Sequence, residues 1–106
     1  MSFEQILEEF HRLSESRSQI LKTIRDSENE ISSISERIEE LLAVTGPEAK
    51  QKEHKDQLSR ARDKRKRIRQ EIAEHEHRVR MVEASIAQLK MRFRWLIDYQ
   101  EAEDEA

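Results

Sequence analysis

Apolar residues recur along this chain at alternating spacings of three and four, in two separate runs. Ten of the twelve positions so spaced between Phe3 and Leu41 are apolar, and so are ten of the twelve between Leu58 and Leu96. A seven-residue repeat sustained over this length is typical of a coiled coil, in which the a and d positions form a buried seam between helices. The pattern therefore predicts two long helices.

The two runs are separated by the only glycine and the only proline of the chain, in the stretch Thr45-Gly46-Pro47. Glycine suits the position just past a helix end, and proline suits the first turn of the next helix. We expect helix 1 over about 2–44, a turn at 45–47 and helix 2 over about 48–100. So short a turn folds the helices back side by side, which predicts an all-α fold: an antiparallel two-helix coiled-coil hairpin, with residues 1–100 as a single domain. A long helical dimer that is only kinked at this point is the alternative.

Polar residues interrupt both runs, and they predict how the helices align. If the chain folds about Gly46, paired residue numbers add up to 92, so that Arg17 faces His75 and Ser27 faces Arg65. Polar seam residues commonly fix the register of a coiled coil, and we interpret these four as register-setting. The same fold makes further pairs, which are Leu13 with Val79, Ile20 with Ile72, and Glu30 with Lys64.

The end of the second run is rich in large apolar side chains, including the only tryptophan and the only tyrosine. In the predicted register Leu89 faces Phe3, so helix 2 continues past the start of helix 1. Apolar side chains in this overhang point in nearly all directions, and two helices alone cannot bury them. Exposed apolar patches with aromatic anchors mark interfaces. The predicted partner-binding residues are Met91, Phe93, Trp95, Leu96, Ile97 and Tyr99. The alternative is that the first turn of helix 1 folds over them.

Additional apolar residues at e positions, namely Leu7, Leu21 and Leu42, widen the stripe on helix 1. A stripe wider than a and d indicates more than two helices in a bundle, and symmetric dimers are the commonest oligomers. We therefore expect two hairpins to dimerise into a four-helix bundle, and we expect the overhang to contact either the second copy or another protein. The function favoured by the sequence is a non-enzymatic coiled-coil structural or adaptor protein that self-associates.

Composition agrees with this class, because 41% of the 106 residues are charged and 35% are hydrophobic, which suits a narrow seam better than a globular core. Charge is uneven: residues 1–49 carry a net −6, residues 50–69 a net +7 and residues 70–106 a net −4. The last six residues, 101–106, read Glu-Ala-Glu-Asp-Glu-Ala, and we expect a disordered acidic tail.

The basic block gives a second function, binding of nucleic acid or another anionic surface through residues 50–69. The candidate anion-binding residues are Arg60, Arg62, Lys64, Lys66, Arg67 and Arg69. No aromatic residue lies within the block to stack on bases, and acidic residues of the facing helix partly neutralise it. Nucleic acid is therefore the less favoured partner.

The sequence offers little catalytic chemistry. His75 and His77 are two residues apart, so on one helix they point away from each other and cannot share a metal ion. One glycine excludes a glycine-rich phosphate loop, and the chain has no cysteine. We predict no catalytic residue, no metal and no cofactor. No apolar run reaches the roughly 20 residues of a membrane span, and we expect a cytoplasmic protein.

The size, the central break and the spacing Tyr99…Glu103 resemble the small secreted WXG-type helical hairpins, whose tail carries a Tyr-x-x-x-Asp/Glu signal. Their Trp-x-Gly turn is absent here, where the break reads Val44-Thr45-Gly46-Pro47, and the strict heptads and high charge also depart from that family. The architecture is similar to the two-helix stalk proteins of secretion and rotary ATPases as well. These resemblances imply a third function, a secreted or secretion-stalk-like hairpin.

Overall fold

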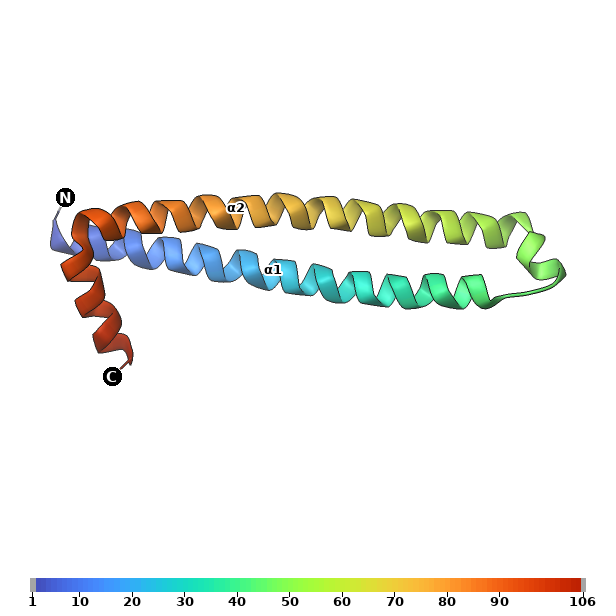
Figure 1. Cartoon of the computed structure of the whole chain (residues 1–106), viewed down its shortest axis with the longest axis horizontal. Coiled ribbons are helices and arrows are strands. Elements are labelled where there is room, and N and C mark those ends of the chain that lie inside the picture. The colour runs from blue at the N-terminus through green and yellow to red at the C-terminus, as the bar shows by residue number, and fades with distance from the viewer. Residues whose placement is uncertain (1, 106) are drawn as a thin grey trace. The chain divides into compact units, whose positions relative to one another are not determined.

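The computed structural model describes residues 2–105, except for the side chains of Leu96 and Gln100. Helix α1 runs over Phe3–Ala43, a short 3-10 helix η1 over Pro47–Lys50, and helix α2 over Lys52–Glu105. The described residues contain no strand. Helices α1 and α2 pack against each other, which confirms the predicted all-α helical hairpin (Figure 1).

Helix α1 begins with reciprocal capping by two polar side chains. The backbone N–H of Gln5 donates to Ser2 Oγ at 3.2 Å, and the backbone N–H of Ser2 donates to Gln5 Oε1 at 2.9 Å. This arrangement satisfies two amide groups that a helix start otherwise leaves without partners. Local sequence therefore fixes where the first helix begins.

The connection between the helices is longer than the predicted turn at 45–47. Gly46 has a φ of 81°, which an L side chain rarely adopts, and Pro47 then starts η1. Gln51 is extended (φ −67°, ψ 142°) and ends this short helix, and its carbonyl accepts the backbone N–H of Lys55 at 3.2 Å. The predicted start of helix 2 at about 48 was therefore too early, because Pro47 begins a separate turn and α2 starts at Lys52.

The chain divides into two compact units. One contains Met1–Lys22 and Glu76–Ala106, and the other is Thr23–His75. In each unit a stretch of α1 packs on a stretch of α2. With one exception, the buried apolar residues are predicted a or d positions: Ile6, Phe10, Leu13, Ile20, Ile24, Ile34, Ile38, Leu41, Ile68, Ile72, Val79 and Ile86. The exception is Ile97. The seam is thus where the heptad pattern placed it.

The alignment along the seam differs from the prediction. Arg65 donates to Ser35 Oγ at 3.3 Å, although the predicted register placed it opposite Ser27. Leu13 lies in one buried cluster with Ile86, although its predicted partner was Val79. The longer connection explains both differences, since it carries the start of α2 further along the chain and so pairs higher residue numbers with a given residue of α1.

The ion pair between Glu30 and Lys64, with 3.3 Å between Oε1 and Nζ, joins two residues that were expected to lie close together. Long charged side chains reach across about one helical turn, so this contact tolerates a displaced register. The buried apolar contacts are more restrictive, because a Leu or Ile side chain touches only its immediate neighbours.

Candidate protein-interaction site

The C-terminal part of α2 changes direction at Phe93 (Figure 1, red segment). The backbone of Phe93 has φ −132° and ψ 35°, far from the helical values near −63° and −42°. Neither glycine nor proline occurs anywhere in α2. Because nothing in the local sequence breaks the helix, tertiary contacts must hold the bend. Residues 94–105 are called the return segment below.

Ile97 anchors the return segment. Its side chain is fully buried, and it belongs to one cluster with Phe10, Leu13 and Ile86. Phe93 is half-buried and packs against the same cluster. Burying an isoleucine side chain contributes roughly 1.5–3 kcal/mol. That gain helps to offset the cost of the non-helical backbone at Phe93.

This arrangement corrects the expectation that the end of helix 2 projects as an overhang with all its apolar residues unburied. Ile97 faces inward, and Phe93 packs on the cluster. The prediction assumed that the helix stays straight, and the bend invalidates that assumption. The side chain of Leu96, a predicted contact residue, lies outside the described part of the structure.

An ion pair also joins the return segment to the preceding part of α2. Lys90 Nζ lies 2.6 Å from Glu101 Oε1, with both side chains more than a third exposed. The same ammonium lies 5.8 Å from the centre of the Phe10 ring, close enough for a cation–π contact. Sequence reasoning missed this contact, because an eleven-residue separation is not a neighbour spacing on a straight helix.

The opposite face of the return segment carries exposed aromatics. Trp95 is 73% exposed and Tyr99 is 60% exposed. Each lies two residues from Ile97, and residues two apart on a helix point to nearly opposite sides. Met91, just before the bend, is 84% exposed. The return segment therefore has an apolar anchor on its inner face and two large aromatic side chains on its outer face.

A hollow of about 500 Å³ lies beside the bend. It is lined by Ala87, Lys90, Met91, Arg94 and Asp98. Arg94 Nε lies 3.4 Å from Asp98 Oδ2, and Lys90 pairs with Glu101, so the charged groups on its wall are already paired. The hollow adds apolar side-chain surface next to the outer aromatics and places paired charges at its edge.

The acidic end of the chain is helical as far as Glu105, which differs from the predicted disorder of residues 101–106. The ion pair from Lys90 to Glu101 ties down its first turn. Further along, a hydrogen bond between the Tyr99 hydroxyl and the Glu103 carboxylate raises the pKa of Tyr99 above its usual value of 10.0, and the negative charge of Glu103 adds to the effect.

All six candidate anion-binding residues are exposed, but they do not share one face of α2. Arg62, Lys66 and Arg69 follow a helical stripe at spacings of four and three, and Arg60, Lys64 and Arg67 follow another. With 3.6 residues per turn, the two stripes lie on opposite flanks of the helix. Lys64 is also engaged by Glu30. One flat anionic surface can therefore contact only half of the block.

The predicted pairing of Ser27 with Arg65 is wrong, and the predicted pairing of Arg17 with His75 stays a prediction. Ser27 is half-buried, while Arg65 reaches Ser35 instead. Arg17 is exposed. His75 is half-buried, and its Nδ1 atom is buried without a hydrogen-bond partner among the described residues. Arg65 therefore joins the two helices of its unit through Ser35 rather than through Ser27.

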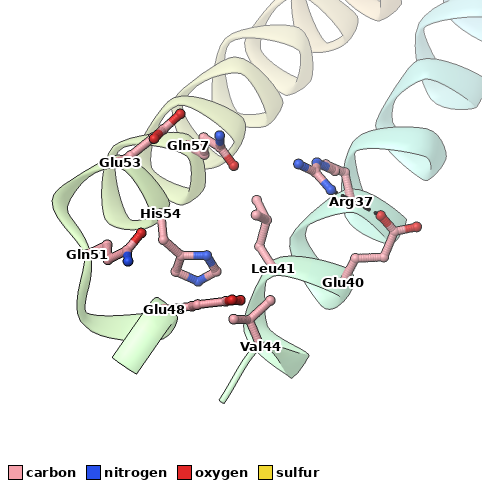
Figure 2. Close-up of a pocket in the computed structure, with 9 residues that line it drawn as sticks. All are labelled: Arg37, Glu40, Leu41, Val44, Glu48, Gln51, Glu53, His54 and Gln57. Atoms are coloured by element: carbon pink, nitrogen blue, oxygen red, sulfur yellow. Dashed lines mark hydrogen bonds and ion pairs between the residues drawn. The ribbon is translucent and has the colours of Figure 1, made fainter. Parts of the chain in front are cut away.

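A hollow of about 400 Å³ lies beside the turn in the unit Thr23–His75, and Figure 2 shows the side chains that line it. Carboxylates of Glu40, Glu48 and Glu53 line it together with His54, and Arg37 contacts Glu40 at 3.3 Å. Within residues 2–105, no three His, Asp or Glu side chains come together as a metal site. Over the same residues, neither long helix contains a stretch apolar enough to cross a bilayer.

Searches among protein-family models, curated proteins and solved structures found no match to this chain.

Proposed function

We propose that this chain is a non-enzymatic coiled-coil adaptor that binds another protein through the outer face of its return segment. The observation that carries the proposal is the pairing of exposed Trp95 and Tyr99 on the face opposite buried Ile97. A helix needs only its inner anchor to stay folded against the hairpin. Two aromatic residues held in water on the other side therefore favour a role in contact with a partner.

Charge indicates the kind of partner. The return segment carries five carboxylates, Asp98, Glu101, Glu103, Asp104 and Glu105, against one basic residue, Arg94. An apolar groove with a basic rim would accept the aromatics and complement the acidic residues around them. The contact residues in this proposal are Met91, Trp95 and Tyr99, and the earlier candidates Phe93 and Ile97 act as internal support.

A capture experiment from the native source tests this proposal. The intact chain, a Trp95→Ala variant and a Met81→Ala variant would be used as bait, since Met81 is also exposed (59%) on α2 but lies away from the return segment. We expect the wild-type chain and Met81→Ala to retain a partner that Trp95→Ala loses. Equal capture by all three baits, or by none, would contradict the proposal.

The proposal includes self-association. Leu21 and Leu42 are 39% and 56% exposed at e positions beside the seam, so apolar surface remains on the outside of both units. A second copy that covers these residues would complete the wider stripe that the sequence predicted. Light scattering across a range of protein concentrations measures this directly, and a constant monomer mass would remove self-association from the proposal.

Electrostatic binding through residues 50–69 is the second candidate. The stripe of Arg62, Lys66 and Arg69 favours it, because three exposed basic side chains share one face over two turns. A mobility-shift assay with DNA and RNA at low and at physiological salt tests it. Binding that survives physiological salt and falls on replacing Lys66 by Glu would support this function, and the absence of binding at low salt would exclude it.

A further inference from the structure

The bend at Phe93 is imposed by contacts rather than by local sequence. Residues 88–98 contain no glycine or proline, and several of them, including Leu89, Met91 and Arg94, are good helix formers. A straight α2 is therefore the conformation that this segment favours on its own. The bent conformation exists because Ile97 and Glu101 find partners on the hairpin.

Those partners are few and all lie in the same unit. Ile97 packs in the cluster of Phe10, Leu13 and Ile86, and Glu101 pairs with Lys90. In a straight α2, Ile97 would leave the cluster, and its surface and that of Phe10 would both face water. A second copy with the same vacancy offers an identical cluster and an identical lysine.

We infer that the return segment exchanges between two copies of this chain. In the exchanged dimer α2 is straight at Phe93, and residues 94–105 of each copy pack on the cluster of the other. The contacts of Ile97 with the cluster and of Glu101 with Lys90 form again between chains, and Phe93 returns to helical φ and ψ. Exchange of an identical element is a low-cost route to a dimer with closed two-fold symmetry.

This inference rests on the self-association in the proposed function and assigns it a mechanism. The dimer would contain two sites built from both chains, since Phe10 and Lys90 come from one copy and Ile97 and Glu101 from its partner. It would also hold the outer aromatics, Trp95 and Tyr99, on a straight helix instead of a bent one. Exchange therefore changes the surface that another protein meets.

The ion pair allows a direct test. A carbodiimide condenses the Lys90 amine and the Glu101 carboxylate, which lie 2.6 Å apart, into an amide without a spacer. Equal amounts of ¹⁴N-labelled and ¹⁵N-labelled chain would be mixed, unfolded, refolded together, separated by size and cross-linked. Mass spectrometry of the joined peptides then reports whether the two residues came from one chain or from two.

We expect the dimer fraction to contain peptides that join a ¹⁴N half to a ¹⁵N half. A dimer in which every Lys90–Glu101 link joins halves of the same label would overturn exchange and leave self-association standing. A monomer at all concentrations, with links only inside one chain, would overturn both. Absence of the link from every fraction would also overturn the inference, because the bent contact itself would then be missing.

Two matched variants test the role of the bend. Phe93→Gly and Phe93→Ala both remove the ring that packs against the cluster, but at this non-helical position glycine disfavours a continuous straight helix and alanine favours it. We expect dimerisation to be weaker in Phe93→Gly than in Phe93→Ala, by roughly fivefold or more given the difference in helix propensity. Equal dimerisation of the two variants would show that straightening at the bend plays no part.

Discussion

Lys90 and Glu101 form an ion pair at 2.6 Å from opposite sides of the bend at Phe93, and the Lys90 ammonium also lies 5.8 Å from the centre of the Phe10 ring. One lysine thus joins three parts of a unit: the start of α1, the end of the straight part of α2 and the return segment. Phe10 also belongs to the buried cluster around Ile97. The ion pair and the apolar cluster together hold the return segment against the rest of its unit.

Among the return-segment side chains that the structure describes, Ile97 is the one that is fully buried. Replacing it with alanine should lower the free energy of unfolding by about 2 kcal/mol or more, because a fully buried side chain leaves a cavity and loses its transfer energy. Urea denaturation followed by circular dichroism measures the change. Trp95→Ala is the control on the same segment and should shift stability by only about 0.5 kcal/mol, since Trp95 is exposed. An equal loss of stability in both variants would contradict the assignment of Ile97 to the inner face and of Trp95 to the outer face.

The ion pair between Lys90 and Glu101 should contribute little to the free energy of unfolding. Both partners are more than a third exposed, and exposed pairs are worth about 0.2–1 kcal/mol. A double-mutant cycle with Lys90→Ala and Glu101→Ala should give a coupling energy in that range that shrinks as salt is added. A coupling energy that is unaffected by molar salt would contradict an exposed electrostatic contact between these two side chains.

Engineered cysteines can distinguish the observed register from the simpler one. The chain has no native cysteine, so each pair can be examined alone. Leu13→Cys with Ile86→Cys should form a disulfide within one chain under mild oxidation, because both positions lie in the same buried cluster. Leu13→Cys with Val79→Cys should form it far more slowly. Faster formation of the disulfide between positions 13 and 79 would instead support the register in which paired residue numbers add up to 92.

His75 weakens the seam. Its buried Nδ1 has no hydrogen-bond partner among residues 2–105, and it occupies a d position where leucine packs well. His75→Leu should therefore raise the free energy of unfolding by about 1 kcal/mol. Thermal denaturation of the variant beside His77→Leu, an exposed control, measures the difference. A loss of stability in His75→Leu alone would indicate that the imidazole ring makes a stabilising contact that a leucine side chain cannot replace.

Tyr99 should titrate above its usual pKa of 10.0, because its hydroxyl hydrogen-bonds the Glu103 carboxylate and the negative charge opposes ionisation. A folded-state pKa above the unfolded value means that this bond contributes fully below the unfolded pKa and is lost as the pH rises through the folded pKa. Glu103→Ala removes both the acceptor and the charge, and it should bring the pKa of Tyr99 back down. Tyr99 is the only tyrosine, so the ultraviolet absorbance of tyrosinate reports this group alone. Identical titration curves for both chains would contradict the hydrogen bond.

The sequence by itself determined the two helices, the hairpin and the seam. The heptad repeat requires every third or fourth residue to be apolar, and twelve of the thirteen buried apolar residues that the structure describes are on it. Gly46 and Pro47 marked the break. Glycine readily adopts the positive φ seen at Gly46, and proline suits the first turn of a helix, where its missing N–H leaves no hydrogen bond unmade.

Only the tertiary structure decided the register and the fate of the C-terminal end. Heptads look the same after a shift of seven residues, so the pattern cannot tell Val79 from Ile86 as the partner of Leu13, and the length of the connection settles it. The bend at Phe93 is likewise invisible locally, because a run of good helix formers predicts a straight helix. It forms because Ile97 and Glu101 gain more from distant Phe10 and Lys90 than the helix loses at one residue.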